Sequence, residues 1–407
     1  NPGGYLSLYN QIDAIAAERF ILDKNFANNG EFKAQTSETS EGLRIFIDAN
    51  GNALVAGQIN GDPVVWKLDS TGKLVSNYGQ SGIARHPISV DTPAVFKDAV
   101  IDSNGNVYIT GQLRIASSGV LSTWDAVVWK FTATGAVDST FGGDGQVELN
   151  VISGNIADTY IISLSDGNFL VGSNSVVNFS VKKMTPAGIL DTAIDTSMRS
   201  VLGTSTLYLL KGLIQHGDGF IFFYTELISP NFLYRARKYS SVGVADTNFG
   251  TGGIIEIGNS SSQSANFFIN FVSPGSEIMI SGELAGMPLL KLYNSLGSGV
   301  ASFNSIALPN FSRVDGITYL NNRYLGVGRY GSGTGQGNSY SMLRFTQNGF
   351  DTSLNGIGYM AAPNVTDASN WPWSVAVDRN GNIYVSGYQA ISGNRYMKVW
   401  RFYESLL

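Results

Sequence analysis

The sequence predicts an all-β fold: a seven-bladed β-propeller built of four-stranded antiparallel blades. Two observations carry this prediction. A phrase of two short strands around a polar turn recurs seven times, and a second phrase that ends in an aromatic residue and a glycine follows most of its copies. A third observation, a copy of the second phrase near the start of the chain, predicts that the two chain ends share one blade.

The first phrase is an apolar strand, a polar turn and a second strand that ends in glycine. Its clearest copies are IFIDANGNALVAGQ (45–58), AVIDSNGNVYITGQ (99–112) and VAVDRNGNIYVSGY (375–388), and weaker copies occupy 161–173, 213–226, 270–283 and 317–329. The six intervals from residue 51 to residue 381 cover 330 residues, a mean period of 55. Asn-Gly between apolar runs predicts a two-residue hairpin turn with positive φ angles.

The second phrase is a strand, a glycine turn and the spacing Asp-x-x-aromatic-x-x-x-Gly, which we call the clasp, followed by one more short strand. Copies occupy 64–82, 127–145, 234–253 and 342–358, with degenerate versions at 181–194 and 289–303. Each unit therefore holds four strands, a to d. A four-stranded sheet cannot bury both faces alone, so such units stack as blades around an axis.

The last unit is split between the chain ends. The seventh first phrase is followed by 396–407, which supplies strand c and then stops without a clasp. DKNFANNG (23–30) has the spacing of the clasp at 138–145, and 30–36 reads as the strand d that follows it. We therefore expect 30–36 to lie antiparallel to 396–404 and to close the ring.

At this level the pattern resembles the delta-60 repeat, a β-propeller repeat of similar length. Residues 127–145 and 375–387 match its consensus best, and the resemblance extends from about Asp23 to the C-terminus. The sequence departs from it where Ser276 and Asn322 replace the turn glycine, and where Ile194 and Leu354 replace the clasp phenylalanine. The resemblance implies a large bacterial surface or extracellular protein and carries no catalytic residues over to this chain.

Residues 1–22 are predicted to form a short N-terminal helical segment, and 23–407 the propeller. Tyr5, Leu8, Ile12 and Ile15 step by three and four, which is typical of an amphipathic helix. Such a helix either caps its own domain or ends a coiled-coil stem. A stem would make the parent protein oligomeric, most simply a homotrimer, and light scattering on a chain extended upstream tests this.

Composition excludes several classes of function. A net charge of −5 with 26 Lys and Arg spread thinly provides no basic stripe for nucleic acid. Cysteine is absent, so no disulfide or thiolate site exists, and no run of eighteen apolar residues predicts membrane insertion. The opening NPGGYLSL, without Met, reads as the start of a processed or excised piece. We expect neither cofactor nor metal: the Asp-rich a–b turns lack the second carboxylate of a calcium loop.

The b–c and d–a connections share one face of a propeller, and here they are the longest: 112–125, 328–340, 361–373 and 388–396. Binding residues sit on such loops. Aromatic and polar groups gather there and suit a sugar ring and its hydroxyls. The candidates are Arg114, Trp124, Arg329, Tyr330, Tyr340, Trp371, Trp373, Tyr388 and Arg395. The competing interpretation is that Trp371 and Trp373 simply fill the wedge between blades.

Catalytic residues are scarce. The two histidines, His86 and His216, fall on opposite faces of the predicted propeller, so no histidine dyad forms. Four polar residues, equally spaced before their a–b turns, are expected to line the central channel: Arg44, Asp98, Asp315 and Ser374.

These patterns favour a secreted or surface-displayed binding or adhesion module, such as a fibre tip, that recognises a glycan or cell-envelope component of another cell. The alternatives are a lyase or hydrolase that acts at the channel mouth through Asp98 or Asp315, and a structural interaction domain.

Overall fold

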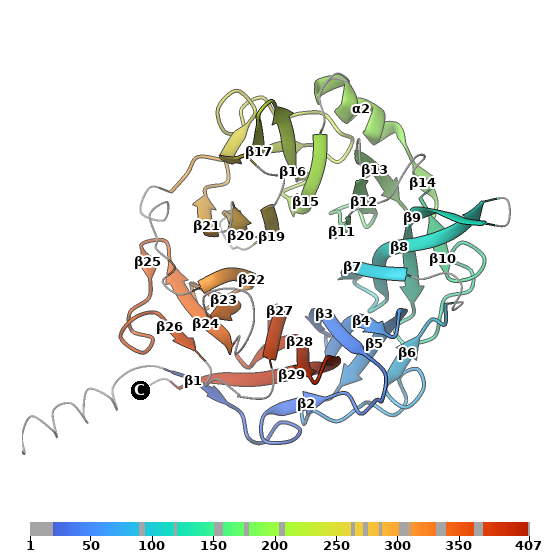
Figure 1. The fold of residues 1–407 in the computed structure, drawn as a ribbon, viewed down its shortest axis with the longest axis vertical. Helices are drawn as coiled ribbons and strands as arrows, with labels where there is room; N and C mark the ends of the chain where they lie inside the picture. Colours follow the sequence, from blue (N-terminus) through green and yellow to red (C-terminus); the bar gives the residue numbers. More distant parts are fainter. Residues whose placement is uncertain are drawn as a thin grey trace, which may run out of the picture.

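The computed structural model describes residues 19–88, 94–117, 120–149, 158–174, 179–202, 208–261, 265–271, 276–284, 287–300, 308, 311–330, 339–361 and 369–405. These residues form antiparallel sheets arranged radially around a central axis, in the order of the chain (Figure 1). The all-β propeller prediction is confirmed at this level.

The first half of the chain builds three four-stranded sheets. The first consists of β3 (Ser40–Ile47), β4 (Ala53–Ile59), β5 (Asp62–Leu68) and β6 (Ile83–Arg85). The second consists of β7 (Ala94–Ile101), β8 (Val107–Ser117), β9 (Val120–Phe131) and β10 (Gln146–Glu148). The third consists of β11 (Thr159–Ser163), β12 (Phe169–Asn174), β13 (Phe179–Met184) and β14 (Leu190–Asp191).

The second half continues around the axis. One sheet consists of β15 (Tyr208–His216), β16 (Gly219–Ile228), β17 (Asn231–Tyr239) and β18 (Ile255–Ser260). The next has three strands, β19 (Ala265–Phe271), β20 (Ile278–Leu284) and β21 (Met287–Tyr293). It is followed by β22 (Phe311–Leu320), β23 (Arg323–Tyr330), β24 (Ser339–Thr346), β25 (Gly349–Phe350) and β26 (Tyr359–Ala361).

The terminal sheet joins both ends of the chain. It consists of β27 (Ser369–Val377), β28 (Ile383–Ile391) and β29 (Asn394–Ser405), with β1 (Arg19–Leu22) and β2 (Glu31–Lys33) both on β29. Glu31 pairs antiparallel with Trp400 and Lys33 with Lys398, so the predicted pairing of 30–36 with 396–404 is confirmed, over a shorter strand than expected.

The described strands depart from seven equal four-stranded blades. Six sheets have four or five strands, whereas the β19–β21 sheet has three. Its expected clasp and fourth strand would fall largely on 301–307, which lie outside the described residues.

Apolar packing between neighbouring sheets holds the radial arrangement. Innermost strands contact one another in sequence, and β27 contacts β3. Each hydrophobic cluster of the described residues draws on two adjacent sheets, and the one between the terminal sheet and the first includes Met397, Val399, Trp66 and Phe26. The burial that sheets cannot achieve singly is thus provided by their neighbours.

The a–b turns differ from the prediction in their chemistry. In the turn after β3, Gly51 has a φ of 80° while Asn50 is absent from the positive-φ residues, and the Gly51 N–H donates to the Asp48 carbonyl at 3.0 Å. The hairpin is therefore a three-residue turn closed by a left-handed glycine, not a two-residue turn. A two-residue turn with positive φ at both positions occurs elsewhere, at Asn321 and Asn322.

The clasp is a fixed hydrogen-bond unit. In the second sheet the Asp138 N–H donates to the Lys130 carbonyl at 3.1 Å, the Lys130 N–H donates to Gly145, and the Gly145 N–H donates to Phe141. In the terminal sheet Asp23, Arg401, Gly30 and Phe26 repeat these bonds in the same order. The clasp aromatic is fully buried in both, as is Leu354, which replaces it in the β22–β26 sheet.

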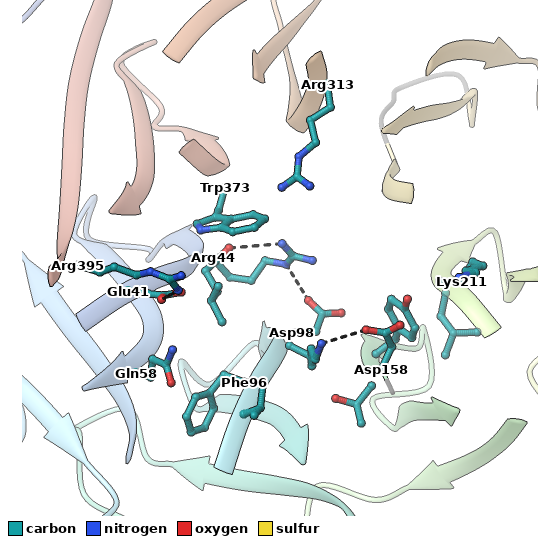
Figure 2. Close-up of a pocket in the computed structure, with 17 residues that line it drawn as sticks. Glu41, Arg44, Gln58, Phe96, Asp98, Asp158, Lys211, Arg313, Trp373 and Arg395 are labelled. Atoms are coloured by element: carbon teal, nitrogen blue, oxygen red, sulfur yellow. Dashed lines mark hydrogen bonds and ion pairs between the residues drawn. The ribbon is translucent and has the colours of Figure 1, made fainter. Parts of the chain in front are cut away.

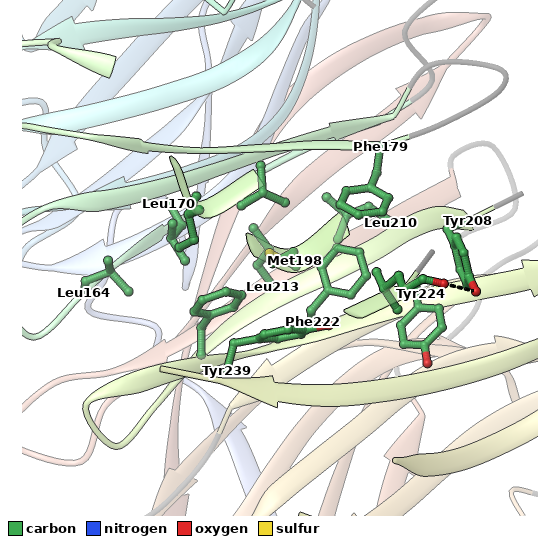
Figure 3. Packing of buried hydrophobic residues seen from close by; sticks show 14 residues of the cluster. Leu164, Leu170, Phe179, Met198, Tyr208, Leu210, Leu213, Phe222, Tyr224 and Tyr239 are labelled. Carbon is green, nitrogen blue, oxygen red and sulfur yellow. Dashed lines mark hydrogen bonds between the residues drawn. The ribbon is translucent and has the colours of Figure 1, made fainter. Parts of the chain in front are cut away.

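The described helix lies where no helix was predicted. Residues Ala193–Leu202 form α2, which stands in the place of a clasp and buries Ile194, Met198 and Leu202 between the third and fourth sheets (Figure 3). The predicted N-terminal helix falls mostly on 1–18, outside the described residues. At its end the prediction is wrong, because 19–22 are strand β1.

Candidate ligand-binding site

Innermost strands share a β-bulge that re-aims one side chain per strand. The pairing of strand a with strand b is shifted in register at a corresponding place in five of the described sheets. The residues skipped there are Leu43, Lys97, Lys211, Asp315 and Trp373, and the β22–β23 pairing also skips Ser312. Bulges disrupt the ladder locally and redirect the bulged residue, and they recur next to functional sites.

In four of these five sheets the glycine that ends the first phrase faces the bulge. A Cβ atom on Gly57 would lie 1.9 Å from the Glu41 carbonyl oxygen, and one on Gly387 would lie 1.9 Å from that of Trp371. Cβ atoms on Gly111 and Gly328 would lie 2.2 Å and 2.3 Å from the carbonyl oxygens of Val95 and Arg313. At these four positions only glycine permits the approach. The bulge at Lys211 faces no glycine, and Gly172 and Gly282 face strands that pair without a bulge.

The bulges border a cavity of about 410 Å³, within the range typical of small-ligand sites, about 300–1,000 Å³. It lies at the channel mouth where the innermost strands begin, since Glu41 and Val95 are each the second residue of their strand. Arg395, from the β28–β29 hairpin, reaches the same cavity, which therefore opens on the face of the long b–c and d–a connections (Figure 2).

Ion pairs connect neighbouring innermost strands around this cavity. The Arg44 Nε atom lies 2.7 Å from Asp98 Oδ1, and Lys97 Nζ lies 3.1 Å from Asp158 Oδ1 (Figure 2). Asp98 also accepts hydrogen bonds from the Ala99 and Ile161 amides. The carboxylate of Asp98 is therefore committed to holding the Arg44 guanidinium and the backbone of the next sheet.

Asp315 is buried behind the cavity and does not line it. Its side chain is fully covered, with Arg313 Nε at 2.5 Å and Arg329 Nη2 at 3.4 Å from Oδ1. Burial raises the pKa of Asp315 to about 7, against the attraction of Arg313, which lowers it. The carboxyl group thus titrates near neutral pH among guanidinium groups.

Aromatic and cationic side chains alternate in a stack beside the cavity. The Trp371 and Tyr388 rings are nearly parallel with centroids 5.7 Å apart. The Arg329 guanidinium lies 4.1 Å from the Trp371 centroid, and that of Arg395 lies 5.0 Å from Tyr388. The stack occupies these ring faces with groups of the protein itself, which supports the wedge-filling interpretation for Trp371.

The structure brings together only part of the predicted site. Trp373, Arg395, Arg44 and Asp98 line the cavity, and Arg329, Trp371, Tyr388 and Asp315 lie next to it. Arg114 and Trp124 pair across β8 and β9 and do not line the cavity. Ser374 does not line it either; its Oγ accepts a bond of 3.4 Å from the Ile45 amide of β3.

Tyr330 and Tyr340 lie in β23 and β24, and their side chains are outside the described residues, as are residues 331–338 and 362–368 of the long loops.

The predicted equivalence of Asp315 with Arg44, Asp98 and Ser374 is wrong. Those three follow the bulge, whereas Asp315 is the bulge residue, because the turn at 321–322 is shorter by one residue than the turns of the other three strands.

Sequence reasoning missed several charged residues of the cavity: Glu41, Lys97, Asp158, Lys211 and Arg313. For Glu41, Lys97 and Arg313 the signal was the motif glycine on the adjoining strand, which locates the bulge but not the residue types around it. Asp158 and Lys211 had no such signal.

Neither histidine lines the cavity. His86 Nε2 is 3.2 Å from the Asp144 carbonyl oxygen and His216 Nε2 is 2.9 Å from that of Ser276.

The carboxylates of the a–b turns accept hydrogen bonds within their own turns, as Asp48 does from the Asn50 and Asn52 amides at 2.9 Å. Across the described ranges no three potential metal ligands gather, and no helix has the length and apolar character to cross a bilayer.

Comparison with known proteins bears on the fold. No family model and no curated protein sequence matches the chain. Polysaccharide lyase Uly1 superimposes with a TM-score of 0.52 at 9% identity, covering 93% of this chain and 92% of the lyase. An ulvan lyase structure bound to -[GlcA(1-4)Rha3S]- has a TM-score of 0.51 at 12% identity, covering 90% and 95%. A protein of unknown function from Dyadobacter fermentans has a TM-score of 0.46 at 11% identity, covering 78% and 96%.

Proposed function

We propose that this protein is a glycan-binding module whose site is the cavity at the long-loop end of the channel. The observation that carries the proposal is the composition of that cavity: aromatic side chains, Phe96, Tyr160 and Trp373, share it with Gln58, Thr159 and charged groups. Flat apolar rings stack on sugar faces while polar groups bind the hydroxyls. The two propellers that superimpose best among those described above are enzymes of polysaccharides by name, which is consistent with a saccharide ligand.

This proposal narrows the predicted binding face. The ring faces of Trp371 and Tyr388 are engaged by Arg329 and Arg395. Their role in the proposal is to hold the wall of the cavity. Trp373 is the ring of this cluster that lines the cavity, with the Arg313 and Arg329 guanidinium carbons 5.0 Å and 5.3 Å from its centroid, and it is the ring to which the proposal assigns the contact with the ligand. A bacterial surface or secreted setting, and an adhesive role toward another cell, remain part of the proposal and rest on the delta-60 resemblance.

An enzyme is the second candidate, since neighbours of similar fold are lyases. The two carboxylates that could act as acid or base are poorly placed for it. Asp98 is bound to Arg44 and two amides, and Asp315 does not reach the cavity. A ligand bound without turnover is the outcome that we expect.

The proposal is tested by a glycan array followed by calorimetry on the hits. Trp373→Ala should weaken binding about tenfold, about 1.4 kcal/mol, whereas Trp124→Ala, the matched aromatic candidate outside the cavity, should not change it. Circular dichroism checks that both variants fold. Absence of any saccharide ligand, equal loss in both variants, or release of unsaturated product from a bound polysaccharide would contradict a pure binding role at this site.

We also propose that the ring is closed and seven-bladed, with the β19–β21 sheet as the blade of which the described residues include three strands. Supporting observations are the contact of β27 with β3, the shared apolar cluster between those sheets, and the pairing of β2 with β29. Sharing one blade between the two chain ends would lock such a ring against opening.

A further inference from the structure

The cavity is cationic although the chain as a whole is acidic. Its lining includes five cationic side chains, Arg44, Lys97, Lys211, Arg313 and Arg395, but only three carboxylates, Glu41, Asp98 and Asp158. The whole chain carries a net charge of −5. Charge of one sign focused in a concave site attracts ligands of the other sign, so the lining favours an anionic ligand.

All three carboxylates of the lining already form ion pairs with cations. Asp98 pairs with Arg44, Asp158 with Lys97 and Glu41 with Arg395. Lys211 belongs to no ion pair formed by the described residues, and burial lowers the pKa of its ammonium group. Its charge is therefore compensated neither by a carboxylate at contact distance nor fully by solvent.

Two guanidinium groups converge in the same space. In Figure 2 the side chains of Arg44, from β3, and Arg313, from β22, point toward one another across the cavity. Each is anchored from behind, Arg44 by Asp98 and Arg313 by Asp315 at 2.5 Å. Anchoring of this kind pre-organises the donors, which reduces the entropy lost when they bind a ligand. Like charges aimed at one point are stabilised by an anion between them.

Trp373 lies against one member of this pair. The Arg313 guanidinium carbon lies 5.0 Å from the centroid of the Trp373 ring, which itself lines the cavity. An acid group between the guanidinium groups would therefore lie near an aromatic ring, and a sugar that carries a carboxylate or sulfate has both an acid group and an apolar ring face to offer.

We propose that the cavity selects an acidic saccharide, with Arg44 and Arg313 binding the carboxylate or sulfate of one sugar and Lys211 contributing a further contact from the opposite wall. This inference rests on the proposed glycan-binding function and specifies its ligand class. Carboxylate and sulfate share the chemistry that recognises them, namely negative oxygens that accept from guanidinium and ammonium donors.

The test is calorimetric titration of the full chain with three probes of similar length: an oligogalacturonate, a sulfated chondroitin oligosaccharide and a neutral maltooligosaccharide. We expect at least one acidic probe to bind ten times or more tightly than the neutral one, and its affinity to fall as sodium chloride is raised. The chondroitin probe carries both carboxylate and sulfate groups, so binding of the oligogalacturonate shows that a carboxylate suffices, whereas binding of the chondroitin probe alone points to its sulfate.

Variants locate the binding to this cavity. Lys211→Gln should weaken the acidic probe about tenfold and Lys211→Arg should retain most of the affinity, because the charge is kept. Lys73→Gln, at an exposed turn that does not line the cavity, is the matched control and should leave binding unchanged. Arg44→Gln should also weaken the acidic probe, and thermal unfolding confirms that each variant folds.

The possible failures are distinguishable. Equal affinity for neutral and acidic probes, with no effect of Lys211→Gln, would overturn the acidic-ligand inference and leave saccharide binding standing. Absence of binding to all three probes and to a wider glycan array would overturn the proposed function as well. Acidic binding that Lys73→Gln weakens as much as Lys211→Gln would show that surface charge, not the cavity, attracts the probe.

Discussion

At the scale of single residues, one backbone position carries different chemistry in each sheet. The bulge residue is aliphatic at Leu43, cationic at Lys97 and Lys211, acidic at Asp315 and aromatic at Trp373. In four of the five sheets the facing glycine leaves room for the bulged backbone, while the type of side chain at the bulge varies. The repeat thus supplies a backbone frame in which the residue at the bulge is free to differ.

Asp315 should make stability depend on pH in an unusual direction. Its pKa is about 7 in the folded chain, above its ordinary value of 3.8, so the folded state binds more protons than the unfolded state between these limits. Stability therefore falls as pH rises from about 4 to about 7, by at most about 4 kcal/mol. The guanidinium groups of Arg313 and Arg329 stabilise the ionised carboxylate of Asp315 and so reduce this loss of stability, whereas the negative charge of Glu283 increases it.

Urea unfolding at several pH values checks this prediction. The stability of wild type relative to Asp315→Asn should decline through that pH window, because the amide does not titrate. A constant difference between the two proteins from pH 4 to pH 8 would show that Asp315 keeps an ordinary pKa.

At the scale of elements, the clasp explains why an Asp, an aromatic residue and a glycine keep their spacing. The Asp carboxylate caps its own turn, as Asp138 does for the Thr140 amide at 3.1 Å, and pairs with the cation that precedes the end of strand c. The glycine donates to the carbonyl of the aromatic residue, which is buried between sheets. Where a helix replaces the clasp, Ile194 takes over the buried position.

The clasp of the terminal sheet should be more sensitive to mutation than that of the β15–β18 sheet. Asp23 and Arg401 form a buried pair, with Arg401 Nε 2.9 Å from Asp23 Oδ2. Asp23→Asn leaves Arg401 as an uncompensated buried cation and should cost about 3–5 kcal/mol. Asp246→Asn, the same position in the β15–β18 sheet, removes a partly exposed pair at 3.6 Å and should cost about 0–1 kcal/mol.

Urea unfolding of the two variants at neutral pH measures both costs. Equal destabilisation would mean that the pair between the chain ends has no special role.

At the scale of the whole molecule, stability depends on residues far apart in the chain. The terminal sheet pairs Arg19 with Ser405 and Lys33 with Lys398, and its apolar face packs on the first sheet. Removing β1 and β2 would expose an edge of β29 together with part of the cluster around Phe26. Such an edge is prone to pair with other chains.

A chain that starts at residue 37 should therefore fail to unfold cooperatively and should associate, whereas one that starts at residue 19 retains every described strand and should behave as the full chain does. Size-exclusion chromatography and thermal unfolding by circular dichroism compare the three. A sharp transition at an unchanged temperature for the chain starting at 37 would refute the proposed lock.

The amino-acid sequence by itself determined the repeat, the hairpins and the pairing of the chain ends, because each depends on local chemistry: apolar alternation, turn glycines and the Asp-aromatic-Gly spacing of Asp23, Phe26 and Gly30. The tertiary structure decided which residues meet at the site. Lys211 has no local signature, and Asp315 was misplaced by one residue because a single shorter turn shifts the register. A bulge changes which way a side chain points without changing the pattern of apolar residues, so only the assembled sheets show which side chains meet at the cavity.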